Sequence, residues 1–216
     1  MDIKEQSNIF AMFDGIAEKE MLMYKAVIEM VQEDYNINSI KVSEITKRAG
    51  IGKGTAYEYF SSKEEIIVKA LQFDTYSHLK RIEGILKEKK EYRDKLYLLL
   101  EYLEVNLPHT NGIGSLMKMF AGTFEIKEDI KKELDKIHTS EACPVTYIEN
   151  IIDDFMRLGL EEKLYTEQDV IIRRSVFATQ VTGYIYCIMN RFYEGGISQE
   201  KAREFTYESI LNLLNS

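Results

Sequence analysis

Apolar residues recur every three or four positions along almost the whole chain, and no run alternates apolar and polar residues as a half-buried strand would. The spacing therefore predicts helices and no sheet. A first long helix is expected from about Glu18 to Asp34, preceded by a short one from Ser7 to Gly15. Asn36, just beyond the long helix, suits a left-handed cap. The expected buried stripe of the long helix is Tyr24, Val27, Ile28 and Val31.

Two short helices and a glycine-bearing turn are predicted between Val42 and Phe60. One face of the first helix carries Val42, Ile45 and Ala49. Gly50 can take the positive φ that often follows a helix end, and the second helix begins near Lys53. Two helices joined in this way make a helix-turn-helix, whose second helix lies in the major groove of DNA.

Longer helices are predicted after this motif. Ser62 and Glu65 form a capping box, and the helix that they begin continues to about Lys89. Such a length suits a helix that joins a DNA-reading head to a separate body. Further helices are expected from about Tyr92 to Pro108, around Leu116 to Phe124, from Lys127 to His138, from Pro144 to Gly159, from Thr166 to Glu194 and from Ser198 to Leu214.

The composition excludes several classes of protein. The 216 residues include 45% hydrophobic and 30% charged ones, as in an ordinary globular protein of one or two domains. No apolar run approaches the roughly 18 residues of a membrane span, and the N-terminus lacks a signal-peptide pattern. Cys143 and Cys187 are too few and too far apart for a disulfide framework or a zinc site. We therefore expect a cytoplasmic protein without a membrane segment, a metal or a cofactor.

Charge is unevenly distributed along the chain. The net charge of −8 opposes non-specific binding to nucleic acid, which depends on neutralising phosphates. Between Asn36 and Lys63, however, five basic residues stand against two acidic ones, so this segment carries +3. A basic tip on an acidic body favours site-specific binding, because the body repels DNA everywhere except at the tip.

The second short helix carries a more specific signal. Residues Lys53 to Phe60 read KGTAYEYF and are followed by SSKEEI, which ends at Ile66. This pattern closely resembles the signature of the TetR family of bacterial repressors. The resemblance is specific over about Glu18 to Phe73. Beyond that segment it depends on the helix pattern alone.

The resemblance implies an all-α protein with two parts. Residues 16–76 would form a three-helix DNA-binding head, with the helix-turn-helix at about 41–60, and residues 77–216 a helical body for effector binding and dimerisation. It further implies a homodimeric repressor that binds a palindromic operator and is released by a small effector, with the long helix as the lever. Apolar residues cover nearly every face of Thr166 to Glu194, as a helix at a dimer interface requires.

By the same resemblance, contacts to double-stranded DNA are expected from the second short helix and its neighbours. Tyr57 and Tyr59 would place hydroxyls along the groove-facing side, whereas Ala56 and Phe60 would pack inward. Lys63 matches the family's phosphate-contacting lysine. The full expected set is Ser43, Thr46, Lys47, Gly52, Lys53, Gly54, Thr55, Tyr57, Tyr59 and Lys63.

The sequence also departs from the family pattern. Gly52 stands where the family often has Ser at the start of the second helix. Glu58 replaces a neutral or aromatic residue, and its carboxylate must either accept a hydrogen bond from cytosine N4 or point away from DNA. Lys41 stands where Ser or Thr is usual, so the first short helix lacks its usual cap.

An apolar cavity in the body is the expected sensor of the effector. Its lining is expected among Met117, Phe120, Phe124, Tyr147, Phe155, Phe177, Tyr184 and Cys187. Core packing explains each of these residues equally well. Because walls rich in methionine accept varied apolar ligands, a largely apolar effector is preferred.

Two other interpretations stay open. The same architecture can serve a regulator whose body binds a protein partner and no small ligand. A helical enzyme that used Cys143 or Cys187 with His138 would need a Cys–His contact and an orienting carboxylate. No spacing in the sequence supports that chemistry, so no enzyme activity is expected.

Overall fold

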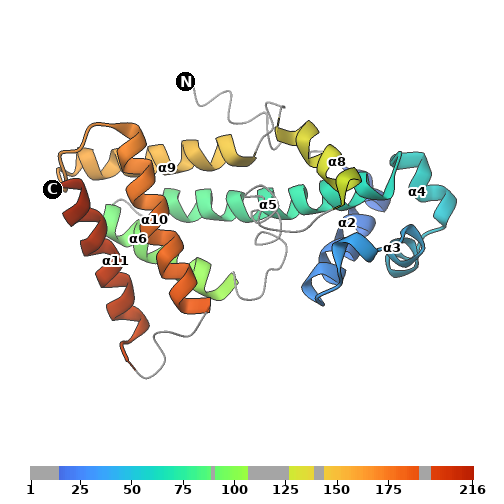
Figure 1. The fold of residues 1–216 in the computed structure, drawn as a ribbon, viewed down its shortest axis with the longest axis horizontal. Coiled ribbons are helices and arrows are strands. Elements are labelled where there is room, and N and C mark those ends of the chain that lie inside the picture. The colour runs from blue at the N-terminus through green and yellow to red at the C-terminus, as the bar shows by residue number, and fades with distance from the viewer. Residues whose placement is uncertain (1–14, 89–90, 107–126, 139–143, 190–195) are drawn as a thin grey trace. The chain divides into compact units, whose positions relative to one another are not determined.

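The computed structural model describes residues 15–88, 91–106, 127–138, 144–189 and 196–216. Within these ranges every regular element is a helix, which confirms the predicted all-α class (Figure 1). None of the described helices is both long and apolar enough to cross a membrane. The elements are α2 (Glu18–Gln32), the 3-10 helix η1 (Ile37–Ser39), α3 (Val42–Ala49), α4 (Lys53–Tyr59), α5 (Lys63–Glu88), α6 (Tyr92–Asn106), α8 (Glu128–His138), α9 (Pro144–Glu161), α10 (Val170–Met189) and α11 (Gln199–Leu214).

The chain divides into two compact units. Among the described residues, the first unit takes 15–79, 127–138 and 144–147, and the second takes 80–88, 91–106, 148–189 and 196–216. We call the described part of the first unit the head and that of the second unit the body. The long helix α5 contributes its first part to the head and its end to the body.

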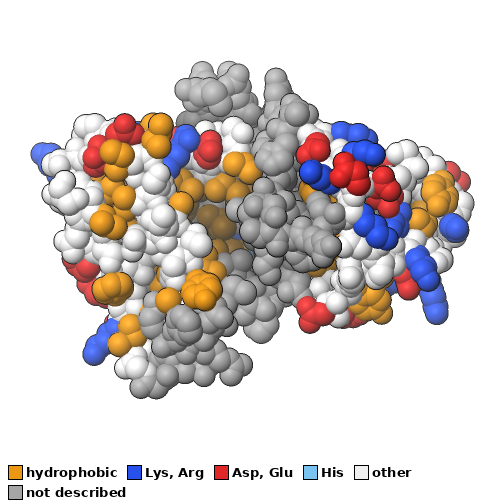
Figure 2. All heavy atoms as spheres, in the orientation of Figure 1, with side chains coloured by type: hydrophobic (Ala, Val, Ile, Leu, Met, Phe, Trp, Pro, Cys, Tyr) orange, Lys and Arg blue, Asp and Glu red, His pale blue; other side chains and the backbone are white. Residues whose placement is uncertain are grey.

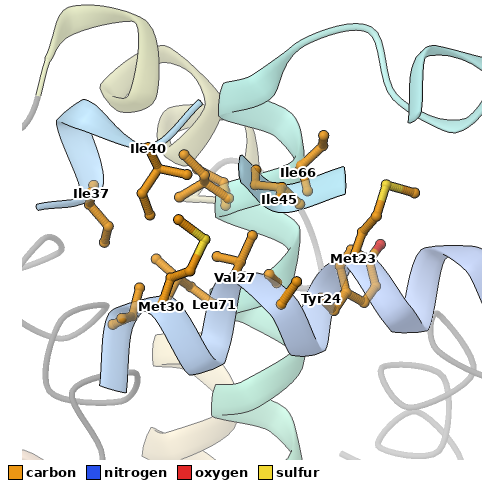
Figure 3. Packing of buried hydrophobic residues seen from close by; sticks show 14 of the residues in the cluster. Met23, Tyr24, Val27, Met30, Ile37, Ile40, Ile45, Ile66 and Leu71 are labelled. Atoms are coloured by element: carbon orange, nitrogen blue, oxygen red, sulfur yellow. The ribbon is translucent and has the colours of Figure 1, made fainter. Parts of the chain in front are cut away.

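A hydrophobic core holds the helices of the head together (Figure 3). Met23, Val27 and Met30 of α2 meet Ile45 of α3 and Leu71 of α5, and all five side chains are at most 1% exposed. Full burial of a side chain of this kind stabilises the fold by roughly 1.5–3 kcal/mol. The helix-turn-helix is therefore held on α2 and α5 by packing.

The end of α2 differs from the prediction. Asp34 takes the left-handed conformation with a φ of 62°, whereas Asn36 has a φ of −67° and caps η1. Asp is one of the few residues other than Gly that tolerate this conformation. The buried stripe also differs: Ile28 is only half-buried, and Met23 and Met30 are buried in addition to the other three predicted residues.

Helix α8 belongs to the head, although the sequence placed it in the body. Ile130 and Leu134, one helical turn apart, are buried in the head's core. At the start of α8, the Lys127 amide donates a hydrogen bond of 2.9 Å to the side-chain oxygen of Asn38 in η1. A short apolar stripe on a mostly charged helix fits any apolar surface, so the sequence could not identify the surface on which α8 packs.

In the body, α6, α10 and α11 pack against one another. The core of the body is aromatic: the Tyr92 ring stacks on Phe155 of α9 with centroids 4.4 Å apart, and Phe155 meets Phe177 of α10 edge-on at 5.4 Å. The Tyr92 hydroxyl donates to Sδ of Met156 at 3.4 Å. Burial raises the pKa of the Tyr92 hydroxyl well above its ordinary value, so this group stays protonated and able to donate.

Helix α9 does not end at Gly159, as was predicted, but continues to Glu161. The residue with a positive φ is Lys163, at 58°. Gly159 lies inside the helix, where the ring of Tyr165 packs closely over it. The glycine is therefore needed for a close approach of a side chain and not for a helix end.

Helix α10 begins four residues later than the predicted Thr166. Residues 166–169 are not helical, and the Asp169 carboxylate accepts hydrogen bonds from the amides of Ile171 at 2.7 Å and Ile172 at 3.2 Å. Asp169 thus caps the helix. At the start of α11 the predicted cap is confirmed, since Ser198 Oγ accepts from the Lys201 amide at 3.2 Å.

Three predicted features lie outside the described residues. They are most of the short helix from Ser7 to Gly15, the helix around Leu116 to Phe124, and the end of the predicted helix at Glu194.

Candidate nucleic-acid interface

The turn between α3 and α4 has the geometry that the sequence predicts. Gly50 lies in the left-handed region with φ 70° and ψ 26°, and its amide donates to the Lys47 carbonyl at 3.3 Å. The Ile51 amide donates to the Thr46 carbonyl at 3.0 Å. A side chain at residue 50 would be strained by this φ, so glycine is favoured at the turn.

The first turn of α3 is capped, although Lys41 has no side-chain acceptor. The carboxylate of Glu44 accepts a hydrogen bond of 2.8 Å from the Lys41 amide. This bond is one half of a capping box. It satisfies the backbone amide of Lys41, so only the half that a Ser or Thr hydroxyl would supply is missing. The glutamate three residues after Lys41 was the signal for this cap in the sequence.

The start of α5 is capped more strongly than predicted. Ser62 Oγ accepts from the Glu65 amide at 3.0 Å, as expected. The Glu65 carboxylate, however, reaches Ser61 and not Ser62, accepting from its amide at 2.8 Å and its hydroxyl at 2.7 Å. Partial burial opposes ionisation of Glu65, but the hydrogen bonds from Lys69 and Ser61 outweigh it and hold the pKa at about 2.

Helix α4 presents one polar face away from the head's core. Ala56 and the following Phe60 are buried in the core, as predicted. Tyr57 is 53% exposed. The side chains that share the outward side with Tyr57 are Lys53 and Glu58, and Gly54 is exposed between them.

Two residues of the expected contact set are turned inward. Thr46 is only 3% exposed, and its hydroxyl donates to the Ser43 carbonyl at 3.4 Å, so it does not reach the surface. Thr46 is therefore removed from the candidate contacts. Tyr59 is half-buried and its ring packs against the head's core, which limits any contact to its outer edge. Both sit on the inner side of their short helices, which the linear pattern did not resolve.

The other candidates vary in exposure. Ser43, Lys47 and Gly52 are exposed, and Thr55 is half-buried. Lys63 is half-buried, and its ammonium lies 3.3 Å from the carboxylate of Glu64. A phosphate that approached Lys63 would therefore compete with this carboxylate.

The candidate interface has fewer uncompensated positive charges than the count of basic residues suggests. Arg48 donates to Glu33 at 2.8 Å, lies 4.0 Å from Glu29 and covers the ring of Tyr35, so its charge is largely compensated. Lysine and arginine side chains are visible over α3 and α4 (Figure 2). Within the described chain, the exposed lysines of this segment without an ion pair are Lys41, Lys47 and Lys53.

The candidate lining of an effector cavity is only partly described. Phe155 and Phe177 contact each other in the core of the body, where packing alone accounts for them. Tyr147 is buried in the other unit, the head, with its ring edge-on to Tyr76. Cys187 is half-buried. Three further candidates, Met117, Phe120 and Phe124, lie outside the described residues.

Tyr184 has a polar environment that the sequence did not predict. Its hydroxyl donates to the carboxylate of Glu104, and Arg203 Nε lies 3.3 Å from the same carboxylate. The side chains of Glu104 and Arg203 are 8% and 13% exposed. A ligand that reached Tyr184 would therefore meet charged groups as well as apolar ones.

The described residues contain no Cys–His contact of the kind that a cysteine-based enzyme, the third interpretation, would need. Cys143 lies outside them, and Cys187 is a free thiol. Nor do they bring together three or more His, Cys, Asp or Glu side chains that could hold a metal ion.

Comparison with known proteins supports the resemblance carried by this helix-turn-helix. Residues 29–70 match the family model described as bacterial regulatory proteins, tetR family. This stretch contains α3, α4 and the first turns of α5, which form the candidate interface.

Relatives extend over most of the chain. The nucleoid occlusion factor SlmA of Aliivibrio fischeri is 23% identical over 189 residues, which cover 87% of this chain and 91% of SlmA. The fatty acid metabolism regulator protein of Bacillus subtilis is 27% identical over 165 residues, which cover 74% of this chain and 79% of the regulator. A crystal structure of the Bacillus subtilis regulator FadR in complex with stearoyl-CoA matches with a TM-score of 0.59 at 19% identity, covering 90% of this chain and 97% of FadR. The structural match supports the same fold.

Proposed function

Since this chain belongs to the TetR family of bacterial regulatory proteins and is a DNA-binding transcriptional regulator, we propose that it is a repressor. It binds a palindromic operator as a homodimer and leaves the operator when a small effector binds in the body. The cytoplasm is the compartment in which such a regulator meets its DNA.

The outward face of α4 is the observation that carries the proposal. A short helix fixed to a packed core by Ala56 and Phe60 presents Lys53 and Tyr57 to the outside, as a recognition helix must. Around it, exposed groups of α3 and the start of α5 can contact phosphates and fix the register on the duplex. The proposed contact set is Ser43, Lys47, Gly52, Lys53, Gly54, Thr55, Tyr57, the edge of Tyr59, and Lys63.

Dimerisation is supported by apolar side chains that the protomer leaves exposed on α10 and α11. Ile171 is 68% exposed and Phe205 66%, and Leu213 of α11 is 47% exposed. Apolar residues that recur on two neighbouring helices fit an interface with a second copy better than they fit contact with water. A two-fold dimer of this kind would place two copies of α4 in successive major grooves, about 34–36 Å apart.

DNA binding is tested by sequencing genomic fragments that the purified protein retains. We expect an inverted repeat whose half-sites are centred about 10 base pairs apart, or a multiple of that distance. Light scattering should give about 50 kDa, twice the 25.2 kDa of one chain. Retained fragments without a common inverted repeat, or a stable monomer, would contradict the proposal.

A largely apolar effector with a polar end is the form of ligand that we propose. The aromatic core of the body offers apolar contacts, and the partly buried Glu104 and Arg203 beside Tyr184 offer polar ones. Stearoyl-CoA, the molecule in the FadR structure, is the first probe because it combines a long apolar chain with a polar group.

The probe is added to a fluorescent operator complex. Allosteric coupling of about 1–3 kcal/mol would weaken operator binding roughly 5- to 150-fold, and operator DNA should weaken binding of the probe by the same factor. If operator affinity stays unchanged with stearoyl-CoA and with shorter and longer acyl thioesters, acyl thioesters are excluded as effectors.

A protein partner for the body is the alternative. The observation that favours it is the likeness to SlmA, whose name refers to nucleoid occlusion and to no metabolite, over most of both chains. This alternative predicts that no small apolar molecule alters operator affinity, whereas a bound protein is recovered with the operator complex.

A further inference from the structure

Glu58 is a carboxylate at a position where it does nothing for the fold. It is the penultimate residue of α4 and its side chain is exposed. Within the described chain no hydrogen bond or ion pair to it occurs. The C-terminal end of a helix carries partial negative charge, so a carboxylate there is unfavourable. Helix stability therefore does not account for this residue.

Gly54 lies one helical turn before Glu58 and on the same side of α4. Its φ is not positive, so the backbone does not require glycine there, and a Cβ at this position would meet no atom within 4 Å. A glycine inside a helix also costs about 1 kcal/mol relative to alanine. Gly54 and Glu58, two neighbouring positions of the outward face, thus both reduce helix stability. Residues that conflict with the local fold in this way are concentrated at functional sites.

Tyr57 completes this face, since it lies three residues after Gly54 and next to Glu58. Gly54 lies at the centre of this face and has no side chain, so a base pair has room to come close to the helix. The outward face therefore combines an open position with a carboxylate beside it.

We infer that Glu58 accepts a hydrogen bond from the N4 amino group of a cytosine in each half-site of the operator. This inference depends on the proposed role of α4 as the DNA-reading helix. In the major groove only cytosine N4 and adenine N6 donate hydrogen bonds. Adenine places its acceptor N7 beside N6, which repels a carboxylate, whereas cytosine has no acceptor next to N4. An exposed carboxylate that faces the groove consequently selects cytosine.

The same carboxylate lowers affinity for other sequences. Wherever no amino group meets it, its charge faces the negative field of the duplex without compensation. On a chain with a net charge of −8 and few free lysines near α4, this repulsion makes the discrimination sharper. Glu58 would thus raise specificity by penalising wrong sites as well as by recognising the right one.

Binding-site selection from a random duplex library tests the inference, using the full-length wild type, Glu58→Gln and Glu58→Ala. The wild type should select a cytosine at one position of each half-site, with a roughly 5- to 150-fold preference over other bases, the usual cost of one mismatched base pair. Glu58→Gln should shift this position toward adenine, because a side-chain amide matches adenine N6 and N7. Glu58→Ala should lose the preference there and bind unrelated DNA more tightly.

The matched control is Glu18→Gln, which removes an exposed carboxylate from α2 and should leave the selected sequence unchanged. Circular dichroism checks that each variant is folded. Because Glu58→Gln keeps the size of the side chain, it tests the inference even if Glu58→Ala does not fold. If the wild type selects an operator and both Glu58 variants select the same bases at every position, the inference is overturned while the proposed function stands. If the folded wild type selects no sequence, the proposed function fails and takes the inference with it.

Discussion

The ring of Tyr165 occupies the space that a side chain at Gly159 would need. A Cβ built on Gly159 would lie 2.6 Å from Oη and 2.7 Å from Cζ of Tyr165. The tyrosine is held there because its hydroxyl donates to the Met156 carbonyl and because it is buried against Tyr92. The close approach thus joins the end of α9 to the segment that leads into α10.

Replacing Gly159 by alanine should destabilise the body. Alanine is the better helix former, but the overlap with Tyr165 should cost more, with a net loss of about 1–3 kcal/mol in the free energy of unfolding by urea. Gly84→Ala is the control, because a Cβ at this position of α5 meets nothing within 4 Å. It should stabilise the protein by roughly 0.5–1 kcal/mol. Equal effects of the two substitutions would contradict the assigned role of the Tyr165 contact.

Replacing Gly54 by alanine should separate stability from DNA binding. The added methyl group lies in open space in the free protein, so the unfolding free energy should rise by roughly 0.5–1 kcal/mol. Operator affinity should fall at the same time, since the methyl group obstructs the approach of DNA. Thermal unfolding and fluorescence anisotropy measure the two quantities. A stabilised variant with full operator affinity would show that DNA does not come close to Gly54.

Lys63→Ala should weaken binding to every DNA sequence by a similar factor. The ammonium group is proposed to contact a phosphate, so its loss should reduce the slope of log affinity against log salt by about 1. The slope is measured by operator titrations between low and physiological salt. Glu64→Gln, which removes the carboxylate 3.3 Å from Lys63 Nζ, is the opposite control and should strengthen binding at low salt. An unchanged slope for Lys63→Ala would exclude the phosphate contact.

A charge on the exposed apolar side chains of α11 should break the dimer. Phe205→Glu and Leu213→Glu each place a carboxylate in the proposed interface, where it would be buried without a partner. Ile185 is half-buried, so a charge there would also disturb the protomer's own packing. Light scattering should give a monomer for both α11 variants. Val105→Glu changes a similarly exposed apolar residue on α6 and should remain a dimer unless the interface includes that helix.

Acid should weaken the junction between α4 and α5 through Glu65. The folded-state pKa of about 2 lies below the ordinary value of 4.5, so ionised Glu65 stabilises the fold above pH 4.5, and this contribution is lost as the pH falls toward 2. Glu65→Gln should therefore be less stable than the wild type at pH 7, with a difference that shrinks between about pH 4.5 and 2. Urea unfolding at a series of pH values measures this difference. A difference that does not change with pH would mean that the charge of Glu65 is not what the cap requires.

Local signals in the sequence predicted the helices and the motif because their causes are local. The turn at Gly50 needs a residue that accepts positive φ, and the cap at Ser62 needs a hydroxyl three residues before an amide. Ala56 and Phe60 could be assigned to the inner side of α4 from spacing along one helix. Each of these inferences involves residues at most a few positions apart.

Tertiary packing decided the rest, because it depends on which surfaces meet. Thr46 and Tyr59 read as contact residues, yet the packing of α3 and α4 turns Thr46 inward and half-buries Tyr59. Ile130 and Leu134 could have packed on either unit, and the head's core accepts them. Gly159 reads as a helix end, but a tyrosine that follows six residues later makes it a site of close contact. The sequence alone determined most of the described helices and the place of the helix-turn-helix, whereas the burial of side chains between those helices decided which of the proposed contact residues remain exposed.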